Sequence, residues 1–159
     1  MSSIYFDYYD SPIGLIEIAG TSTAVIALNF VAERCREVAS HALVAEAVRQ
    51  VDEYFDGKRR EFEIEMALEG TDFQQRVWRQ LGTVPYGSVA SYQDIARGVG
   101  RPTAVRAVGA ANGRNPIAIM VPCHRIIGKN GHLVGYGSGL WRKKWLLKHE
   151  GYPVTGIRR

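Results

Sequence analysis

The pattern of the sequence changes at Gly70–Thr71, and this change limits the fold more than any other feature. Before it, stretches of alternating or continuous apolar residues are typical of β-strands. After it, apolar residues recur every three or four positions, as in amphipathic helices. The strand-like stretches are Ile4–Gly14, Leu15–Gly20, Thr23–Phe30 and Glu61–Met66. We therefore predict an α+β fold, in which residues 1–70 form a small N-terminal sheet-plus-helix domain and residues 71–159 form a mostly α-helical C-terminal domain.

Helix signals place one helix before this boundary and several after it. Residues 40–55 carry apolar side chains on one helical face and are closed by Gly57. In the second half, Ser91 precedes Asp94 by three residues, which is the spacing of a capping box. Gly100 separates the helix that starts there from the next one, and this order is the helix-turn-helix pattern. The segments expected in the second half are helices at 71–84, 92–99, 103–112 and 140–151, and a buried extended stretch at 115–122.

The two halves of the chain carry opposite net charge. Residues 1–70 contain 13 acidic and 6 basic residues, whereas residues 71–159 contain 3 acidic and 14 basic residues, so the net charges are −7 and +11. A field this positive attracts polyanions and favours a nucleic-acid partner, although a charged surface also keeps a protein soluble. No apolar run approaches the roughly 18 residues of a membrane span, and the N-terminus lacks the pattern of a signal peptide. We therefore expect a cytoplasmic protein with no membrane partner.

The helix expected at residues 103–112 is built from small residues. Ala104, Gly109 and Ala110 let its backbone approach another surface closely, and Arg106 is its long side chain. This composition suits close approach to another molecule, with Arg106 reaching past the helix. Tight packing against another helix, with Arg106 in solvent, explains the same composition.

Cysteine and histidine usage limits the chemistry. The chain has 2 cysteines, too few for a disulfide framework, and its 4 histidines are scattered, so we expect reduced thiols and no structural zinc site. Cys123 is followed by His124 and Arg125 and lies near glycine-rich loops. Such an environment lowers the pKa of a thiol and makes it a nucleophile. Glu150 is the candidate for orienting the His124 ring. The alternative is that Cys123 is an inert, buried residue.

The segment "VPCHRI" at residues 121–126 follows "RAVG" at 106–109 and "NP" at 115–116. Together they resemble the active-site signature of the O6-alkylguanine-DNA alkyltransferases, also called methylated-DNA–protein-cysteine methyltransferases. The resemblance runs from residue 71 to about residue 152, through "GTDFQQRVW", "VPYGSVASYQDIA", "RAVGAANGRNPI" and "WLLKHEG" in this order. The N-terminal half matches only loosely, as an accessory sheet domain.

The resemblance implies direct-reversal DNA repair, in which Cys123 takes the alkyl group from O6-alkylguanine, and from O4-alkylthymine, in DNA. It implies that His124 accepts the thiol proton through a water and that Glu150 holds His124. Tyr92 would donate a hydrogen bond to the leaving guanine, and Asn115 would brace the turn beneath the site. Because a thioether sulfur is a poor leaving group, we expect one reaction per molecule and a stable S-alkylcysteine, with no cofactor and no metal ion.

The resemblance also implies how double-stranded DNA is bound. Arg106 would enter the duplex and fill the gap left by the extruded base, with its helix docked in the minor groove. Contacts mainly to phosphates would give little sequence specificity and strong salt dependence. The residues expected at the DNA are Arg106, Ala104, Gly109, Ala110, Tyr92 and Arg125, and those expected in the substrate pocket are Tyr136, Gly137, Ile126 and Val134. We expect a monomer in solution.

Two other functions are compatible with these residues. A cysteine hydrolase using Cys123, His124 and Glu150 would turn over repeatedly on an acyl substrate, but it would not explain Arg106 or the basic half. A DNA-binding module without chemistry, like the alkyltransferase-like proteins that bind lesions, would explain the basic half. Such modules lack the nucleophilic cysteine that this chain has.

Overall fold

The computed structural model describes residues 3–128, 131 and 135–154, and it divides the chain into two compact units. The first unit is Met1–Leu68 with Pro116–Met120, and the second is Glu69–Asn115 with Val121–Arg159. The predicted α+β class is confirmed, with a sheet in one unit and mainly helices in the other. The predicted boundary assigned Pro116–Met120 to the second half, whereas this segment belongs to the first unit.

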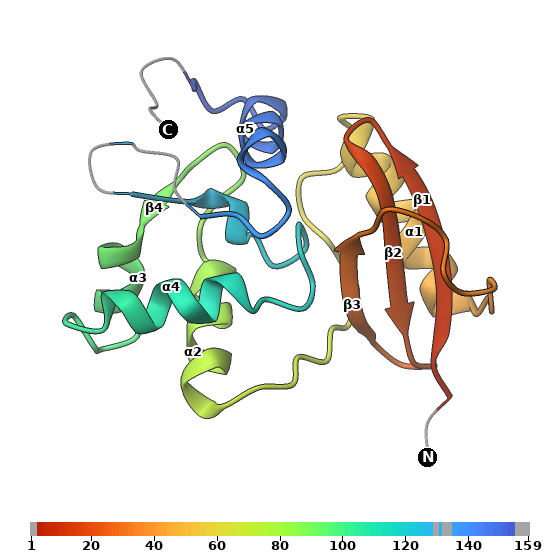
Figure 1. The fold of residues 1–159 in the computed structure, drawn as a ribbon, viewed down its shortest axis with the longest axis horizontal. Helices are drawn as coiled ribbons and strands as arrows, with labels where there is room; N and C mark the ends of the chain where they lie inside the picture. Colours follow the sequence, from red (N-terminus) through yellow and green to blue (C-terminus); the bar gives the residue numbers. More distant parts are fainter. Residues whose placement is uncertain (1–2, 129–130, 132–134, 155–159) are drawn as a thin grey trace. The chain divides into compact units, whose positions relative to one another are not determined.

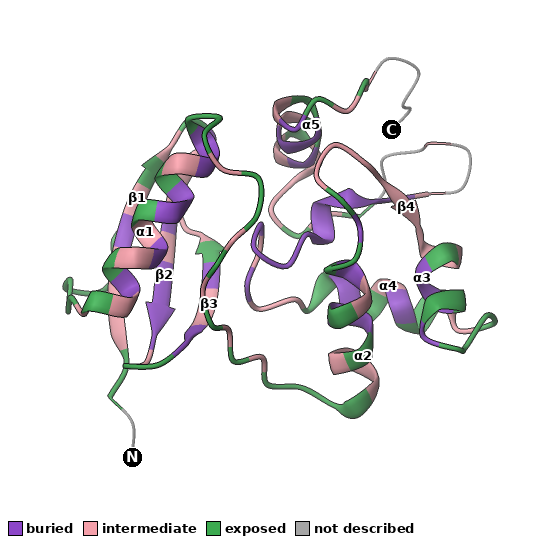
Figure 2. Cartoon of the chain, turned by 180° about the vertical axis from the view of Figure 1, so that it is seen from behind, coloured by how far each residue is buried: buried purple, intermediate pink, exposed green. Residues whose placement is uncertain are grey.

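The first unit is an antiparallel sheet with a helix packed against it (Figure 1). Its strands lie in the order β1-β2-β3, and Gly14, at φ 121°, allows the tight turn between the first two. The core between sheet and helix is apolar, and β2 is largely buried (Figure 2). Fully buried members of this core are Ile16, Ile18, Leu28, Val44 and Val51. The elements are β1 (Tyr5–Ser11), β2 (Gly14–Gly20), β3 (Val25–Phe30) and α1 (Ala42–Phe55).

The strand predicted at residues 61–66 is wrong, although the predicted alternation of exposure along it is present. Within this described segment, pairing is limited to a bridge between Met66 and Val25 of β3. The buried side chain of Gln50 competes for the backbone, since it accepts from the Glu63 N–H at 2.9 Å and donates to the Glu63 carbonyl at 3.0 Å. Further along β3, Leu28 forms a bridge with Ile117 and not with residues 61–66.

The second unit contains the predicted helix-turn-helix pair, α3 (Tyr92–Gly98) and α4 (Val105–Gly113). The predicted capping box at the start of α3 is confirmed, with the Ser91 side chain and Asp94 each bonding the other's backbone N–H. Helix α2 packs on both helices, and its Trp78 indole donates to the Ala111 carbonyl at 2.9 Å. The other elements are α2 (Asp72–Leu81), β4 (Ala90–Ser91), the 3₁₀ turn η1 (Cys123–Arg125), β5 (Ile126–Ile127) and α5 (Leu140–His149).

The apolar segment before Cys123 is buried as predicted, but it is not one extended stretch. Ile119 adopts φ 71°, which is rare for a β-branched residue, and the Met120 N–H bonds back to the Ala118 carbonyl. The segment therefore turns sharply shortly before Cys123.

No helix in the described ranges combines the length and the hydropathy that a membrane span requires.

Candidate active site

Cys123 begins the η1 turn and is 6% exposed. The amide of Asn115 donates to the Val121 carbonyl at 2.8 Å, and the Cys123 N–H donates to the same carbonyl at 2.8 Å. From α4, the buried Asn112 amide reaches the Cys123 carbonyl at 3.5 Å. These contacts fix the backbone on which the thiol is carried.

A buried chain of charged hydrogen bonds lies beside this turn. The Arg125 guanidinium holds Glu150 with two donors, from Nε to Oε1 at 2.7 Å and from Nη2 to Oε2 at 3.1 Å. Its Nη1 donates to the Val84 carbonyl at 2.8 Å. Glu150 Oε2 lies 2.7 Å from His124 Nε2, and neither side chain of this pair is exposed. This arrangement joins His124 and Glu150, as predicted, and adds Arg125 to them.

The chain of hydrogen bonds determines which nitrogen of His124 carries the proton. Burial acts to raise the pKa of Glu150, but its interactions with His124 and Arg125 outweigh burial and hold that pKa well below its ordinary value. Glu150 is therefore an ionised acceptor, so Nε2 of His124 donates to it. Burial lowers the pKa of His124, which keeps the ring neutral. Its Nδ1, buried and without a hydrogen bond to any described residue, is then an unprotonated base.

The predicted low pKa of Cys123 is wrong for the protein without substrate. Burial raises the pKa of its thiol above the ordinary value, outweighing a hydrogen bond from Asn115 and the charge of Lys143, which both lower it. The prediction assumed that the positive charge of Arg125 acts on the thiol, whereas Arg125 forms an ion pair with Glu150 that neutralises this charge. Cys123 is thus a thiol that needs a base, and His124 is the neighbouring base.

Tyr92 lies between α4 and the active-site loops. It follows β4, whose parallel pairing of Ser91 with Ile127 brings the start of α3 beside the residues that follow Cys123. A Cβ atom on Gly109 would lie 3.8 Å from the Tyr92 ring, and one on Gly135 would lie 3.4 Å from its hydroxyl. Burial raises the pKa of Tyr92 and the charge of Cys123 raises it further, so Tyr92 is a phenol that can donate.

The predicted pocket residues are only partly covered by the structure. The Tyr136 hydroxyl is buried and makes no hydrogen bond to a described residue, and burial, followed by the charge of Cys123, raises its pKa well above the ordinary value. Gly137 is exposed, and a Cβ atom at this position would meet no described atom within 4 Å. Ile126 is fully buried in β5, and Val134 lies outside the described residues.

The predicted DNA-contact residues differ in how far they are exposed. Arg106 and Ala110 are exposed on one face of α4, while Ala104 and Gly109 are half-buried. The prediction that Arg125 contacts DNA is corrected by its burial. Arg125 is 7% exposed, and its Nε, Nη1 and Nη2 groups donate to Glu150 or Val84. Its guanidinium is therefore not available to a phosphate.

Two polar residues near Cys123 escaped the sequence analysis. The sequence placed Asn112 only in a helix of small residues and Lys143 only in the helix expected at residues 140–151, but Asn112 is 5% exposed and Lys143 is 0% exposed. Lys143 could have been found from its spacing, because it falls three residues after Leu140 and four before Leu147, on the apolar face of α5.

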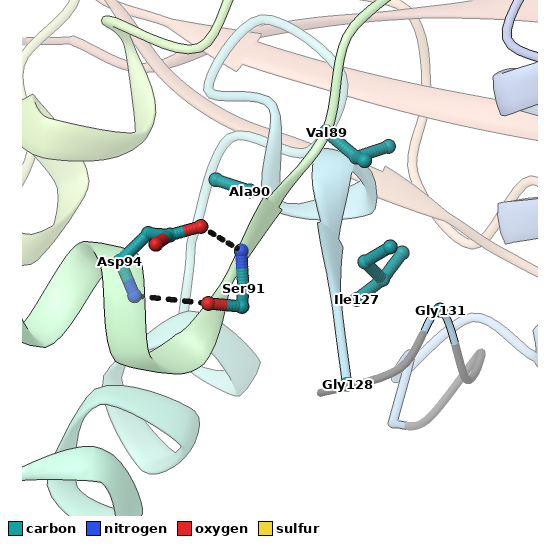
Figure 3. Close-up of a pocket in the computed structure, with 7 residues that line it drawn as sticks. All are labelled: Val89, Ala90, Ser91, Asp94, Ile127, Gly128 and Gly131. Carbon is teal, nitrogen blue, oxygen red and sulfur yellow. Dashed lines mark hydrogen bonds between the residues drawn. The ribbon is translucent and has the colours of Figure 1, made fainter.

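A pocket of about 250 Å³ opens beside the β4–β5 pair (Figure 3). On one side it is lined by β4, the residue before β4 and the capping residue Asp94 of α3, and on the other side by Ile127 of β5 and two glycines that follow it. The lining residues are Val89, Ala90, Ser91, Asp94, Ile127, Gly128 and Gly131. The pocket thus borders the elements that carry Tyr92 and Ile126, but neither residue lines it.

Within the described residues, no three His, Cys, Asp or Glu side chains are grouped so that they could hold a metal ion. The fold and the site together define a class: a helix-turn-helix domain that carries a buried Cys–His–Glu centre.

Comparison with known proteins identifies the family. The DNA-binding domain of 6-O-methylguanine DNA methyltransferase matches residues 72–152, and the ribonuclease-like domain of the same family matches residues 4–68. The chain belongs to the 6-O-methylguanine DNA methyltransferase family, which confirms the resemblance inferred from "VPCHRI".

Individual relatives match over nearly the whole chain. The methylated-DNA–protein-cysteine methyltransferase of Mycobacterium leprae is 51% identical over 150 residues, which are 91% of each protein. The crystal structure of Mycobacterium tuberculosis O6-methylguanine methyltransferase matches with a TM-score of 0.85 and 45% identity over 93% of each chain. That of Mycobacterium tuberculosis OGT in complex with DNA matches with a TM-score of 0.84 and 45% identity, over 96% of this chain and 94% of that one.

Proposed function

We propose that this protein repairs DNA by transferring the alkyl group of O6-alkylguanine to Cys123. The observation that carries the proposal is the buried Arg125–Glu150–His124 chain, which makes His124 a neutral base beside a buried thiol. Relatives at 45–51% identity are named as methyltransferases of this kind, and one was crystallised with DNA.

In the proposed reaction, the proton of the Cys123 thiol passes through a water to Nδ1 of His124. The sulfur then attacks the alkyl carbon, so that an S–C bond forms while the C–O6 bond of the guanine breaks. Tyr92, a phenol held near the site, donates to the departing base, whose negative charge grows as the bond breaks. Asn115 holds the turn that carries the sulfur, and Tyr136 forms a wall of the pocket, with Gly137 and Ile126 offering backbone groups to the base.

The product explains why the reaction would occur once per molecule. The transfer leaves Cys123 as a thioether, and the neutral His124 can activate water but cannot make a thioether sulfur leave. A cysteine hydrolase differs at this point, because its thioester intermediate is open to attack by water. We therefore propose stoichiometric repair that needs no cofactor.

Helix α4 is the proposed DNA-binding element. Its exposed face carries small residues at Ala107 and Ala110 beside Arg106, so its backbone can approach a groove closely. Small side chains cannot form hydrogen bonds to base edges, which favours binding in the minor groove with little sequence specificity. Arg106 is long enough to take the place of the base that has been rotated out of the duplex.

The experiment measures the mass of the protein after incubation with duplex DNA containing O6-methylguanine. A gain of one methylene unit, localised to Cys123 and limited to one per molecule under excess DNA, supports the proposal. Cys123→Ala should show no gain, while Cys35→Ser, at an exposed free cysteine, should behave like the natural chain. Repeated product formation without a mass change would show a hydrolase, and bound but unchanged DNA would show a binding module.

Two finer points belong to the same proposal. O4-alkylthymine presents the same bond, an alkyl carbon on an exocyclic oxygen, and the mass experiment repeated with O4-methylthymine tests it. We also propose that the protein is a monomer, because the large apolar side chains exposed among the described residues are few, namely Ile4, Val38 and Trp141. Sedimentation velocity at micromolar concentration tests this.

A further inference from the structure

Lys143 is a fully buried lysine that the proposed reaction has not used. It lies in the first turn of α5, is 0% exposed, and its Nζ reaches the Gly135 carbonyl at 3.4 Å, beside Tyr136. Helix α5 packs against η1, the turn that begins with Cys123. An ammonium group removed from water costs stability unless the surroundings compensate it, so its burial here needs a reason.

The charges around Cys123 suggest what Lys143 compensates. The groups that face the sulfur or its neighbours are His124 and Arg125 from η1, Arg142 and Glu150 from the start and end of α5, Tyr92 from α3, and Tyr136 from the preceding loop. Arg142 faces Tyr136 and donates to the Ser138 carbonyl at 2.8 Å. His124 is neutral, Arg125 matches Glu150, and both tyrosines are held as phenols. Lys143 and Cys123 interact electrostatically, and the charge of each lowers the cost of charging the other.

We propose that Lys143 is a positioning residue for the transfer reaction, whose buried ammonium group stabilises the thiolate of Cys123. The inference rests on the proposed function, because only a reacting Cys123 needs a thiolate. Lys143 holds no reacting atom. It acts through the sulfur, by favouring its charged form when His124 takes the proton. Burial lowers the pKa of Lys143 to about 8, so the group is mostly charged at neutral pH.

The test is the pH dependence with which iodoacetamide alkylates Cys123. This reagent needs no DNA: the thiolate attacks its methylene carbon, an S–C bond forms and iodide leaves. All chains carry Cys35→Ser, which removes the exposed thiol, and the Cys123 peptide is quantified by mass spectrometry. The variants are Lys143→Met, Lys143→Arg and, as a matched control, Lys144→Met at the exposed neighbouring position on α5.

Lys143→Met removes a positive charge that favours the thiolate, so the pKa of Cys123 should rise. At pH 7, where the Lys143 ammonium is mostly charged, we expect Lys143→Met to slow alkylation by about ten-fold, which corresponds to one unit in the pKa of the thiol. The rate at high pH, where Lys143 is itself deprotonated, should stay unchanged. Lys143→Arg should recover part of the rate lost at pH 7, and Lys144→Met should match the parent. A Lys143→Met alkylation rate at pH 7 equal to that of the parent would overturn the proposal. Because the reagent bypasses DNA, this outcome is distinct from a failure of methyl transfer.

A second measurement needs no substitution at Lys143, in case Lys143→Met does not fold. The pKa of the Lys143 ammonium is followed by ¹⁵N-edited NMR before and after Cys123 is alkylated by iodoacetamide. Loss of the sulfur's ability to ionise should lower the pKa of Lys143 further, since the charge of Cys123 raises it in the free protein. An unchanged Lys143 pKa after alkylation would contradict the proposed pairing.

Discussion

The Arg125–Glu150 contact should dominate the stability of the second unit, and Arg125→Met tests this. Methionine keeps an apolar chain of similar length but removes the donors at 2.7, 3.1 and 2.8 Å to Glu150 and Val84. Glu150, whose side chain has no exposed area, would then be a buried carboxylate without its cation. Breaking a buried ion pair from one side costs about 3–5 kcal/mol, so we expect the free energy of unfolding to fall by that amount.

The assay is urea unfolding at pH 7.5, followed by tryptophan fluorescence. The 3 tryptophans, Trp78, Trp141 and Trp145, belong to the second unit, so the signal reports that unit rather than the sheet. Lys148→Met, at an exposed position of α5, is the matched control and should change the free energy of unfolding by less than about 0.5 kcal/mol.

A double-mutant cycle isolates the pair. In Arg125→Met combined with Glu150→Gln, the uncompensated carboxylate is gone, so the double variant should lose less stability than the two single losses added together. The coupling expected for groups in direct contact is about 2 kcal/mol or more. A loss under about 1 kcal/mol for Arg125→Met, or additive losses in the double variant, would refute the assignment of a buried, charge-matched pair.

Three further predictions concern the site and its surroundings. Gly87→Ala should destabilise the second unit by about 2 kcal/mol, and Gly100→Ala should destabilise it less. Both glycines have positive φ, but only at Gly87 would a Cβ lie 3.0 Å from the Glu150 carbonyl oxygen. Urea unfolding of the two variants measures the difference. Arg106→Ala, at an exposed site, should leave stability unchanged but slow transfer from duplex DNA by about ten-fold, with little effect on single-stranded substrate; equal slowing of both would contradict the role. Folding lowers the pKa of both His124 and Glu150, so the unfolded chain binds more protons. The stability contributed by these two groups should therefore be fully present above pH 6.5. As the pH falls below 6.5 it should be lost through protonation of His124, and below pH 4.5 also through protonation of Glu150. Thermal unfolding measured across this pH range would contradict the prediction if the melting temperature did not fall.

Local sequence signals predicted the helices well because helix caps and turns depend on the types of residues that are close together in the sequence. Ser91 and Asp94 form the expected capping box, and Gly100, at φ 76°, makes the turn between α3 and α4. The prediction of a strand at residues 61–66 was wrong for the opposite reason. The Gln50 side chain, which lies in another element, bonds to the backbone of this segment, and no local sequence pattern shows that contact.

The active site shows why adjacency in sequence misleads about electrostatics. Arg125 lies two residues after Cys123 and was expected to lower its pKa, yet Glu150, distant in the chain, matches the Arg125 charge. Lys143, twenty positions away and surrounded in sequence by basic residues, has an electrostatic link to the sulfur. A charge acts on a buried group according to whether another charge already compensates it, and compensation is a property of packing. The residue types of the Cys–His–Glu centre could therefore be identified from the motif, whereas the cation that serves the sulfur required the fold.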